Sequence, residues 1–210
     1  MKKDIIIFFA LPNEANSFLN HSKIKFSKIS NIAYNSPYKD ISIKVFITGV
    51  GKKAVEEFFS SSSFDSNSSI FIKAGTCAVI DDNLDILKRY VPLLISDGSE
   101  VITIDKKAEN FIKERKNIAL VGKKLISLEK ALNSKDLRQR YANINGAFVD
   151  MECYYVAQNL NGAIFIPLLV GTDYGYGDVD NDFMSNLNNA SKLLSESLID
   201  VIENIYRYNF

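Results

Sequence analysis

Short, continuously apolar segments rich in β-branched residues recur along the chain, and they constrain its fold more than any other feature. Such segments are typical of strands that are buried on both faces of a parallel sheet. From this pattern we expect strands at residues 5–10, 43–48, 70–74, 91–96, 118–121, 147–151 and 164–170.

Helical patterns fill several of the intervals between these segments. The longest covers residues 183–206, where apolar residues such as Leu187, Leu194 and Leu198 recur at spacings of three and four and define one amphipathic helix. Because strands alternate with helices, we expect one domain over residues 1–210 with a three-layer α/β/α sandwich architecture. The other helices are expected at residues 13–19, 52–59, 106–115, 128–141 and 152–160.

The composition excludes several classes of protein. Apolar residues make up 47% of the chain, and 25 basic side chains balance 25 acidic ones, so nucleic acid and anionic membranes are not expected partners. The apolar run at the N-terminus lacks a cleavage pattern, and no run approaches the roughly 20 residues that span a bilayer. Two isolated cysteines, Cys77 and Cys153, suit neither a disulfide framework nor a zinc site. We therefore expect a cytoplasmic protein.

Acidic residues and glycine turns follow several of the expected strands. Glu14, Glu152 and Asp173 each come soon after one of these strands, and glycine-containing segments at residues 49–51 and 75–77 follow two more. In open α/β sheets, ligands bind beyond the carboxyl ends of the strands. The sequence therefore predicts that three acids and two glycine turns converge on one edge of the sheet.

Elimination narrows the chemistry of such a site. The sole histidine, His21, falls at the end of the first expected helix, where a surface role is favoured. One histidine argues against a Ser-His-Asp or Cys-His mechanism and against a multi-histidine metal site. The chain also lacks a complete dinucleotide fingerprint and a phosphate-binding GxxxxGK[ST] loop. We expect no cofactor and no metal, which leaves acid–base chemistry by carboxylates.

Five short motifs stand in order over nearly the whole chain. They are Ala10-Leu11-Pro12-Asn13-Glu14, Thr48-Gly49-Val50-Gly51-Lys52, Lys73-Ala74-Gly75-Thr76-Cys77-Ala78, Val149-Asp150-Met151-Glu152 and Gly171-Thr172-Asp173. Together they resemble the nucleoside phosphorylase and nucleosidase superfamily, and most closely its methylthioadenosine/S-adenosylhomocysteine nucleosidases. The resemblance implies a nucleoside phosphorylase-like fold with a central mixed sheet. It also implies hydrolysis of the N-ribosidic bond of a purine nucleoside to free base and a ribose derivative.

The resemblance implies a role for each of the three acids. Asp173 would be the general acid that protonates a purine ring nitrogen, and Glu14 would orient and deprotonate the attacking water. Glu152 would accept hydrogen bonds from the ribose hydroxyls. An acid at the leaving group and an activated water suit an oxocarbenium-like sugar, as in glycoside hydrolysis. The other substrate-binding positions that the resemblance implies are Val50, Thr76, Cys77, Asp150 and Met151.

Some positions depart from the nucleosidase pattern. Ala78 stands where the family has glycine, which predicts crowding of the backbone beside the substrate. Tyr154 and Tyr155 stand where small residues are usual, and we expect them to narrow or reshape the pocket. Residues 122–124 occupy the region where many nucleosidases place an aromatic near the base. The base and the 5′ substituent therefore stay open, and a futalosine nucleosidase fits equally well.

Two alternatives to hydrolysis follow from the same residues. A phosphorylase would clamp phosphate with arginines, but none falls in the turn 49–51 or directly before Gly75, where Lys73 stands as a point charge. Glu14 would also repel phosphate, so hydrolysis is favoured. The alternative of another class is a nucleoside-binding protein that has lost activity. The resemblance further implies a homodimer and a place in methionine salvage.

Overall fold

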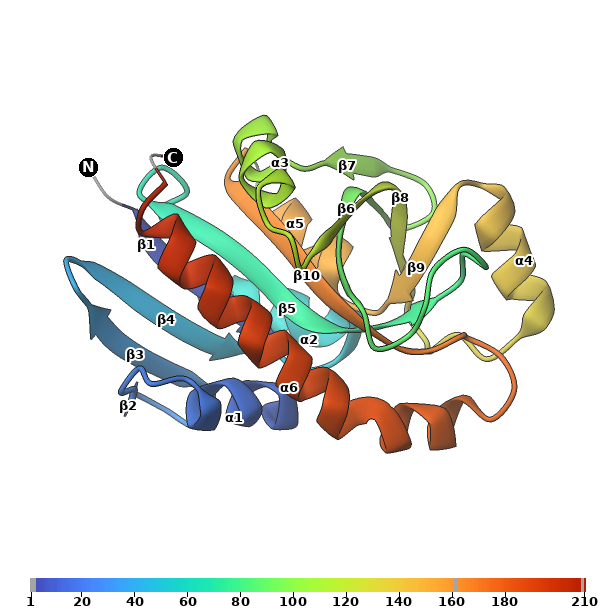
Figure 1. Ribbon diagram of the computed structural model, residues 1–210, viewed down its shortest axis with the longest axis horizontal. Coiled ribbons are helices and arrows are strands. Elements are labelled where there is room, and N and C mark those ends of the chain that lie inside the picture. The colour runs from blue at the N-terminus through green and yellow to red at the C-terminus, as the bar shows by residue number, and fades with distance from the viewer. Residues whose placement is uncertain (1–2, 161, 209) are drawn as a thin grey trace.

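The computed structural model describes residues 3–160, 162–208 and 210. Among them, ten strands form one mixed sheet that carries helices on both faces (Figure 1). This confirms the expected α/β/α architecture. The strands are β1 (Asp4–Phe9), β2 (Ser27–Lys28), β3 (Ala33–Tyr38), β4 (Ile41–Ile47), β5 (Ser69–Val79), β6 (Arg89–Ser96), β7 (Val101–Thr103), β8 (Ala119–Ser127), β9 (Gly146–Asp150) and β10 (Ile164–Asp173). The helices are α1 (Pro12–His21), α2 (Gly51–Ser60), α3 (Lys106–Lys113), α4 (Lys135–Asn143), α5 (Cys153–Asn159) and α6 (Val179–Ile205).

The centre of the sheet consists of parallel strands that are buried on both faces. Strand β1 pairs in parallel with β4 and β5, and β5 pairs in parallel with β10. Every residue of β10 is buried, and every residue of β5 except Thr76 is buried. The continuously apolar segments therefore form the interior of the sheet, as their sequence predicts.

One side of the sheet closes on itself, which the sequence pattern does not reveal. Strand β10 pairs antiparallel with β6, β6 runs parallel to β8, β8 runs parallel to β9, and β9 pairs antiparallel with the end of β5. Strand β5 belongs both to this ring and to the open side because it is 11 residues long. Its first residues pair with β1, and its last two, Ala78 and Val79, pair with β9.

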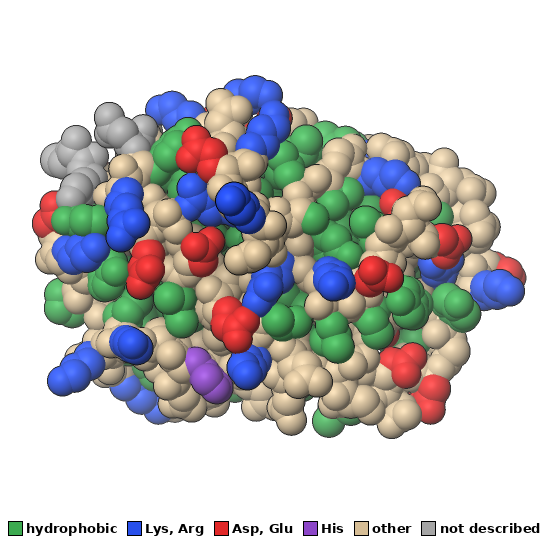
Figure 2. Space-filling model, viewed as in Figure 1, with side chains coloured by type: hydrophobic (Ala, Val, Ile, Leu, Met, Phe, Trp, Pro, Cys, Tyr) green, Lys and Arg blue, Asp and Glu red, His purple; other side chains and the backbone are tan. Residues whose placement is uncertain are grey.

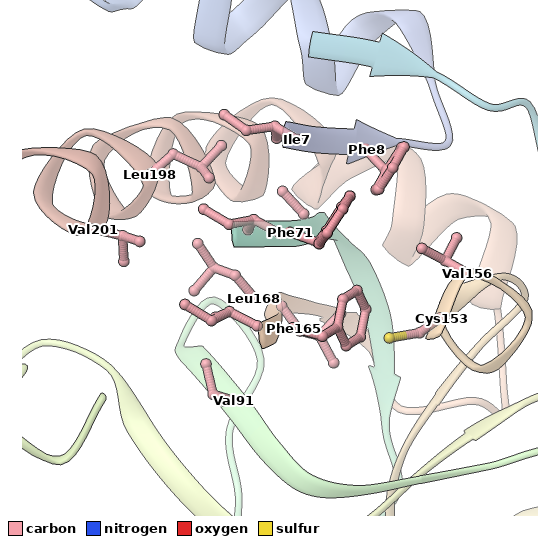
Figure 3. Packing of buried hydrophobic residues seen from close by; sticks show 14 of the residues in the cluster. Ile7, Phe8, Phe71, Val91, Cys153, Val156, Phe165, Leu168, Leu198 and Val201 are labelled. Carbon is pink, nitrogen blue, oxygen red and sulfur yellow. The ribbon is translucent and has the colours of Figure 1, made fainter. Parts of the chain in front are cut away.

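Helices cover the sheet on both faces and share one core with it. Helix α6 packs on β5 and β10 with α1 beside it, while α2 and α5 pack together on the opposite face (Figure 1). Figure 3 shows apolar side chains from both sets of elements meeting there, among them Phe71, Leu168 and Leu198. Cys153 is a buried free thiol in the same core.

The outside of the molecule matches the balanced composition. Basic and acidic side chains are interspersed over the face shown in Figure 2. Among the described helices, none combines the length and the apolarity that crossing a bilayer requires.

Three differences between the expected and observed elements bear on the site. Strand β5 continues through residues 75–79, so the expectation of a glycine turn at residues 75–77 is wrong, and β10 extends to Asp173, which was expected beyond the strand end. Helix α4 begins at Lys135 instead of residue 128 because Ser134 caps it, its Oγ accepting the N–H of Leu137 at 3.3 Å. Strands β2, β3 and β7 lie outside the ring and lack a continuous apolar run, so the pattern does not predict them.

Candidate active site

A cavity of about 330 Å³ lies where β1, β5, β9 and β10 end, a size typical of small-molecule sites. The structure brings every residue that the sequence nominated to this one cavity, although their individual roles stay predictions. These residues are Glu14, Val50, Thr76, Cys77, Asp150, Met151, Glu152 and Asp173.

Glu14 lies in the first turn of α1 with its carboxylate buried and fixed by three donors. The backbone N–H of Leu11 donates to Oε2 at 3.3 Å. Thr76 donates both its N–H, at 2.9 Å, and its hydroxyl, at 3.0 Å, to Oε1. Burial raises the pKa of Glu14, while the ammonium of Lys73 and the hydroxyl of Thr76 oppose that rise. These three donors fix the orientation of the Glu14 side chain at the cavity.

Lys73 is a buried cation on β5 that lies next to Glu14 and Glu152. Its Nζ is 3.8 Å from Glu152 Oε2. Burial alone would lower the pKa of Lys73, but the carboxylates of Glu152 and Glu14 outweigh burial, so the pKa is raised and the side chain stays cationic.

Glu152 is held from a second side by the start of α2. Gly51, the first residue of that helix, donates its N–H to Glu152 Oε1 at 2.8 Å. Gly51 has a φ of 83°, a backbone conformation that favours glycine. Because the N-terminus of a helix carries partial positive charge, this contact and the ammonium of Lys73 together fix the position of the Glu152 side chain.

Asp150, the last residue of β9, fixes the start of α5. Ser127 donates its hydroxyl to Oδ1 at 2.5 Å, and Cys153 donates its N–H to Oδ2 at 2.9 Å. Burial and the negative charge of Glu152 raise the pKa of Asp150 to about 7, against the opposing effect of Lys73. Both oxygens are engaged within the protein, so Asp150 positions the segment that carries Glu152.

Asp173 reaches the cavity through an irregularity in β10. The pairing of β10 with β5 shifts register between Gly171 and Asp173. As a result Thr172 and Asp173 both line the cavity, although successive residues of a regular strand point to opposite faces. Oδ1 accepts the N–H of Gly175 at 2.8 Å, and Oδ2 accepts the hydroxyl of Thr172 at 3.0 Å. Burial raises the pKa of Asp173 against these two hydrogen bonds.

Several lining residues are not predicted by the motifs. The capping signal of Ser134 shows that the residues before it lie outside α4, where they are free to reach the cavity. Residues 122–124, which occupy the sequence region where many nucleosidases place an aromatic near the base, do not line the cavity, since they belong to β8, where Lys123 pairs with Asp81 at 2.6 Å. The unpredicted lining residues include Ala131, Leu132, Val179, Asp180 and Phe183.

The departures from the nucleosidase pattern do not obstruct the cavity. Ala78 lines it from a regular stretch of β5 paired with Val149 and has no positive φ, so the expected crowding of a turn is absent. Neither Tyr154 nor Tyr155 lines it, and the hydroxyl of Tyr154 donates to Glu100 Oε2 at 2.9 Å. The expectation that these tyrosines narrow the pocket is wrong because α5 directs them into the protein core.

Other reactive groups of the chain lie away from the cavity or are unsuited to it. His21 ends α1 on the surface, where its Nδ1 is 2.7 Å from the carbonyl oxygen of Ser17. Burial raises the pKa of the Cys77 thiol well above its usual value, which suits a filler and not a nucleophile. Among residues 3–160, 162–208 and 210, no three His, Cys, Asp or Glu side chains are grouped as a metal site requires, and no arginine lines the cavity.

No protein-family model matches the chain, and no curated protein sequence matches it. Solved structures do. The Helicobacter pylori 5′-methylthioadenosine/S-adenosylhomocysteine nucleosidase superposes with a TM-score of 0.87 at 16% identity, over 96% of this chain and 98% of that chain. The Helicobacter pylori futalosine hydrolase superposes with a TM-score of 0.84 at 16% identity, over 96% of this chain and 97% of that chain. The Neisseria meningitidis 5′-methylthioadenosine/S-adenosylhomocysteine nucleosidase in complex with methylthio-immucillin-A superposes with a TM-score of 0.81 at 12% identity, over 96% of this chain and 99% of that chain.

These similarities extend over nearly the full length of each protein. The chain therefore has the fold of the nucleoside phosphorylase and nucleosidase superfamily, as its five motifs predict.

Proposed function

We propose that this chain is a nucleosidase that hydrolyses the N-ribosidic bond of a purine nucleoside, as one catalytic domain over residues 1–210. One observation carries the proposal. A single cavity is lined by Asp173, which forms no ion pair within the described residues, and by Glu14, which lies beside a buried cation. Asp173 donates a proton to the departing purine, and Glu14 takes one from the attacking water. Glu152 binds the ribose hydroxyls, and charge separation of this kind suits an oxocarbenium-like transition state.

The charges around the cavity support water over phosphate as the nucleophile. Lys73 is the basic residue among the described lining residues, and Glu152 already engages it. A phosphate dianion would meet mostly negative charge at short range, where repulsion costs several kcal/mol at an intermediate dielectric. The acidic lining residues are Glu14, Asp150, Glu152, Asp173 and Asp180.

The apolar lining supports a nucleoside whose 5′ substituent has a thioether and no net charge, as do the methylthio group and the zwitterionic homocysteinyl group. Leu11, Val50 and Phe183 supply apolar surface to the cavity, which suits a thioether group, and Asp180 disfavours an anionic one. A mutant of the Helicobacter pylori enzyme was solved with 5′-methylthioadenosine in its active site. We therefore rank methylthioadenosine or S-adenosylhomocysteine first and futalosine second. The homodimer, the cytoplasmic location and the place in methionine salvage stay predictions.

Product analysis with and without phosphate tests this function. The purified protein is incubated with adenosine, methylthioadenosine, S-adenosylhomocysteine, inosine and futalosine, and free base and sugar products are quantified. We expect release of base and reducing sugar in phosphate-free buffer. Release only with added phosphate, together with ribose-1-phosphate, would identify a phosphorylase. Nucleoside binding by calorimetry without any turnover would identify an inactive binding protein.

A further inference from the structure

We propose that Lys73 is a positioning residue, a fixed internal counter-ion for the carboxyl groups of Glu14 and Glu152, and not a ligand for phosphate. Its part in turnover rests on the proposed function, whereas its effect on the two carboxylates does not. The inference begins from its place in the sequence. Lys73 follows Ile70, Phe71 and Ile72 on a strand whose neighbours are buried on both sides, and its side chain is only 1% exposed. A lone charge in such a place requires a partner.

The local backbone is built around the ammonium group. Its Nζ lies 3.8 Å from Glu152 Oε2 and donates to the carbonyl oxygen of Ala74 at 3.4 Å. A Cβ atom on Gly75 would lie 2.5 Å from this nitrogen and 3.7 Å from Glu14 Oε1. Glycine at position 75 therefore leaves the space in which the ammonium fits between two carboxylates, and this observation does not depend on any ligand.

The titratable groups that face Lys73 explain why it is unsuited to hold phosphate. Glu14 faces it from α1, Glu152 and Asp150 from the end of β9, and the Cys153 thiol from α5. An anion entering the cavity would have to displace Glu152 from the ammonium while lying beside further acids. The charge of the lysine is already balanced by carboxyl groups of the protein, so its function is to pair with them.

Lys73 has a direct consequence for the base. Glu14 must be ionised to take a proton from water, and burial opposes its ionisation. An opposite charge within about 4–6 Å lowers a carboxyl pKa by roughly 1–3 units. Thr76 also favours the ionised form, whereas Glu152 disfavours it. Loss of the lysine charge should therefore move the ionisation of Glu14 upward by one pH unit or more.

The pH dependence of kcat/KM in phosphate-free buffer tests this role. Lys73→Gln removes the charge and keeps a polar group, Lys73→Arg keeps the charge, and Lys113→Gln is the matched control in an exposed ion pair of α3. We expect the acid limb to move up by at least one pH unit in K73Q, with about a tenfold loss below the limb. We expect K73R to stay closer to the parent and K113Q to be unchanged. Equal shifts in K73Q and K73R, or no shift in K73Q, would overturn the proposal.

A titration that needs no turnover separates this proposal from the proposed function. The Glu14 carboxyl carbon is followed by 13C NMR, assigned by its disappearance in Glu14→Gln. A higher pKa in K73Q supports the counter-ion role even if no nucleoside is cleaved, and an unchanged pKa overturns it even if cleavage occurs. If K73Q does not fold by circular dichroism, Gly75→Ala displaces the ammonium without removing it. The same upward shift is expected in G75A, and its absence would overturn the proposal.

Discussion

Three buried acids of the cavity differ in whether a cation lies beside them. Glu14 and Glu152 lie beside the buried ammonium of Lys73. Asp173 forms no ion pair within the described residues and accepts hydrogen bonds only from Gly175 and Thr172. All three are buried, and burial alone favours the protonated form of any carboxyl.

Different neighbours allow carboxyl groups in one cavity to supply both an acid and a base. Burial raises the pKa of Asp173, which favours a carboxylic acid able to donate a proton. Beside Glu14 the lysine opposes the same effect and favours a carboxylate able to accept one. The pKa of both acids is raised by burial, and only at Glu14 does a neighbouring cation oppose that rise. Different environments around two titratable groups are typical of acid–base catalysis. The roles are set by the neighbours of each acid, so changing a neighbour should change the role.

Replacing Asp173, the acid without a neighbouring cation, should have the largest effect on turnover. Asp173→Asn keeps the shape but cannot donate an acidic proton to the leaving purine. We expect kcat to fall by roughly 10²–10⁴-fold, with the dissociation constant of the substrate changed only a few-fold. Single-turnover kinetics and calorimetry measure the two quantities, and Asp136→Asn on the exposed side of α4 is the matched control. Full activity in D173N would remove Asp173 from the mechanism.

Replacing the base beside the cation should have a somewhat smaller effect and a different pH signature. Glu14→Gln cannot deprotonate water, so kcat should fall by about 10²-fold. In the parent protein the rate should fall at low pH as Glu14 is protonated, from a pKa that burial raises above its usual value. E14Q should lose this acid limb, and Glu56→Gln on α2 should retain it. An acid limb that persists in E14Q would show that another group is the base.

The sequence predicts the three acids better than it predicts their surroundings. Strand interiors are read from continuous apolar runs, so Glu14, Glu152 and Asp173 come together at one edge of the sheet as predicted, although Asp173 ends β10 instead of following it. The closure of β9 onto β5 is a long-range pairing, which a local pattern does not contain. For the same reason the glycine of residues 75–77 suggests a turn, whereas the strand continues through it to reach β9.

Lys73 and the loop before α4 differ in how far the local sequence encodes their place in the cavity. A lysine inside an apolar strand signals a buried anionic partner, but the pattern does not distinguish a bound phosphate from the protein's own carboxylates. Ser134 is a local N-cap signal, so the start of α4 was predictable from sequence. The contact of Ala131 and Leu132 with the cavity was not, because it depends on where the loop lies after folding.

Asp150 tests whether proximity to the lysine suffices to ionise an acid. Its pKa is raised to about 7, first by burial and then by Glu152. A folded pKa above the unfolded value stabilises the protein below about pH 4, and this stability is lost as pH rises through about 7. Asp150→Asn stays neutral, so it should avoid this loss, which is at most about 4 kcal/mol between pH 4 and 8. Urea unfolding at both pH values measures it.

The opposite pH dependence at Asp81 is the control for Asp150. Lys123 and the two contacts from Asn83 outweigh desolvation and lower the pKa of Asp81, so its contribution is lost as pH falls. Asp81→Asn should therefore reduce stability at high pH relative to low pH. A D150N protein with the same pH profile as the parent would contradict a protonated Asp150.

The smallest expected effect comes from removing the one threonine hydroxyl that donates to Glu14 or the one that donates to Asp173. Thr76→Val removes the hydroxyl that donates to Glu14 Oε1 at 3.0 Å, which raises the pKa of Glu14 and should lower kcat/KM below the acid limb by about tenfold. Thr172→Val removes the hydroxyl that donates to Asp173 Oδ2, which also raises a carboxyl pKa, but here the change keeps the acid protonated and should extend activity to higher pH. Thr→Ser variants, which keep both hydroxyls, are the controls. The same Thr→Val change would thus weaken the base at position 76 and strengthen the acid at position 172. If both variants changed activity in the same direction, the surroundings of Glu14 and Asp173 would not differ as proposed.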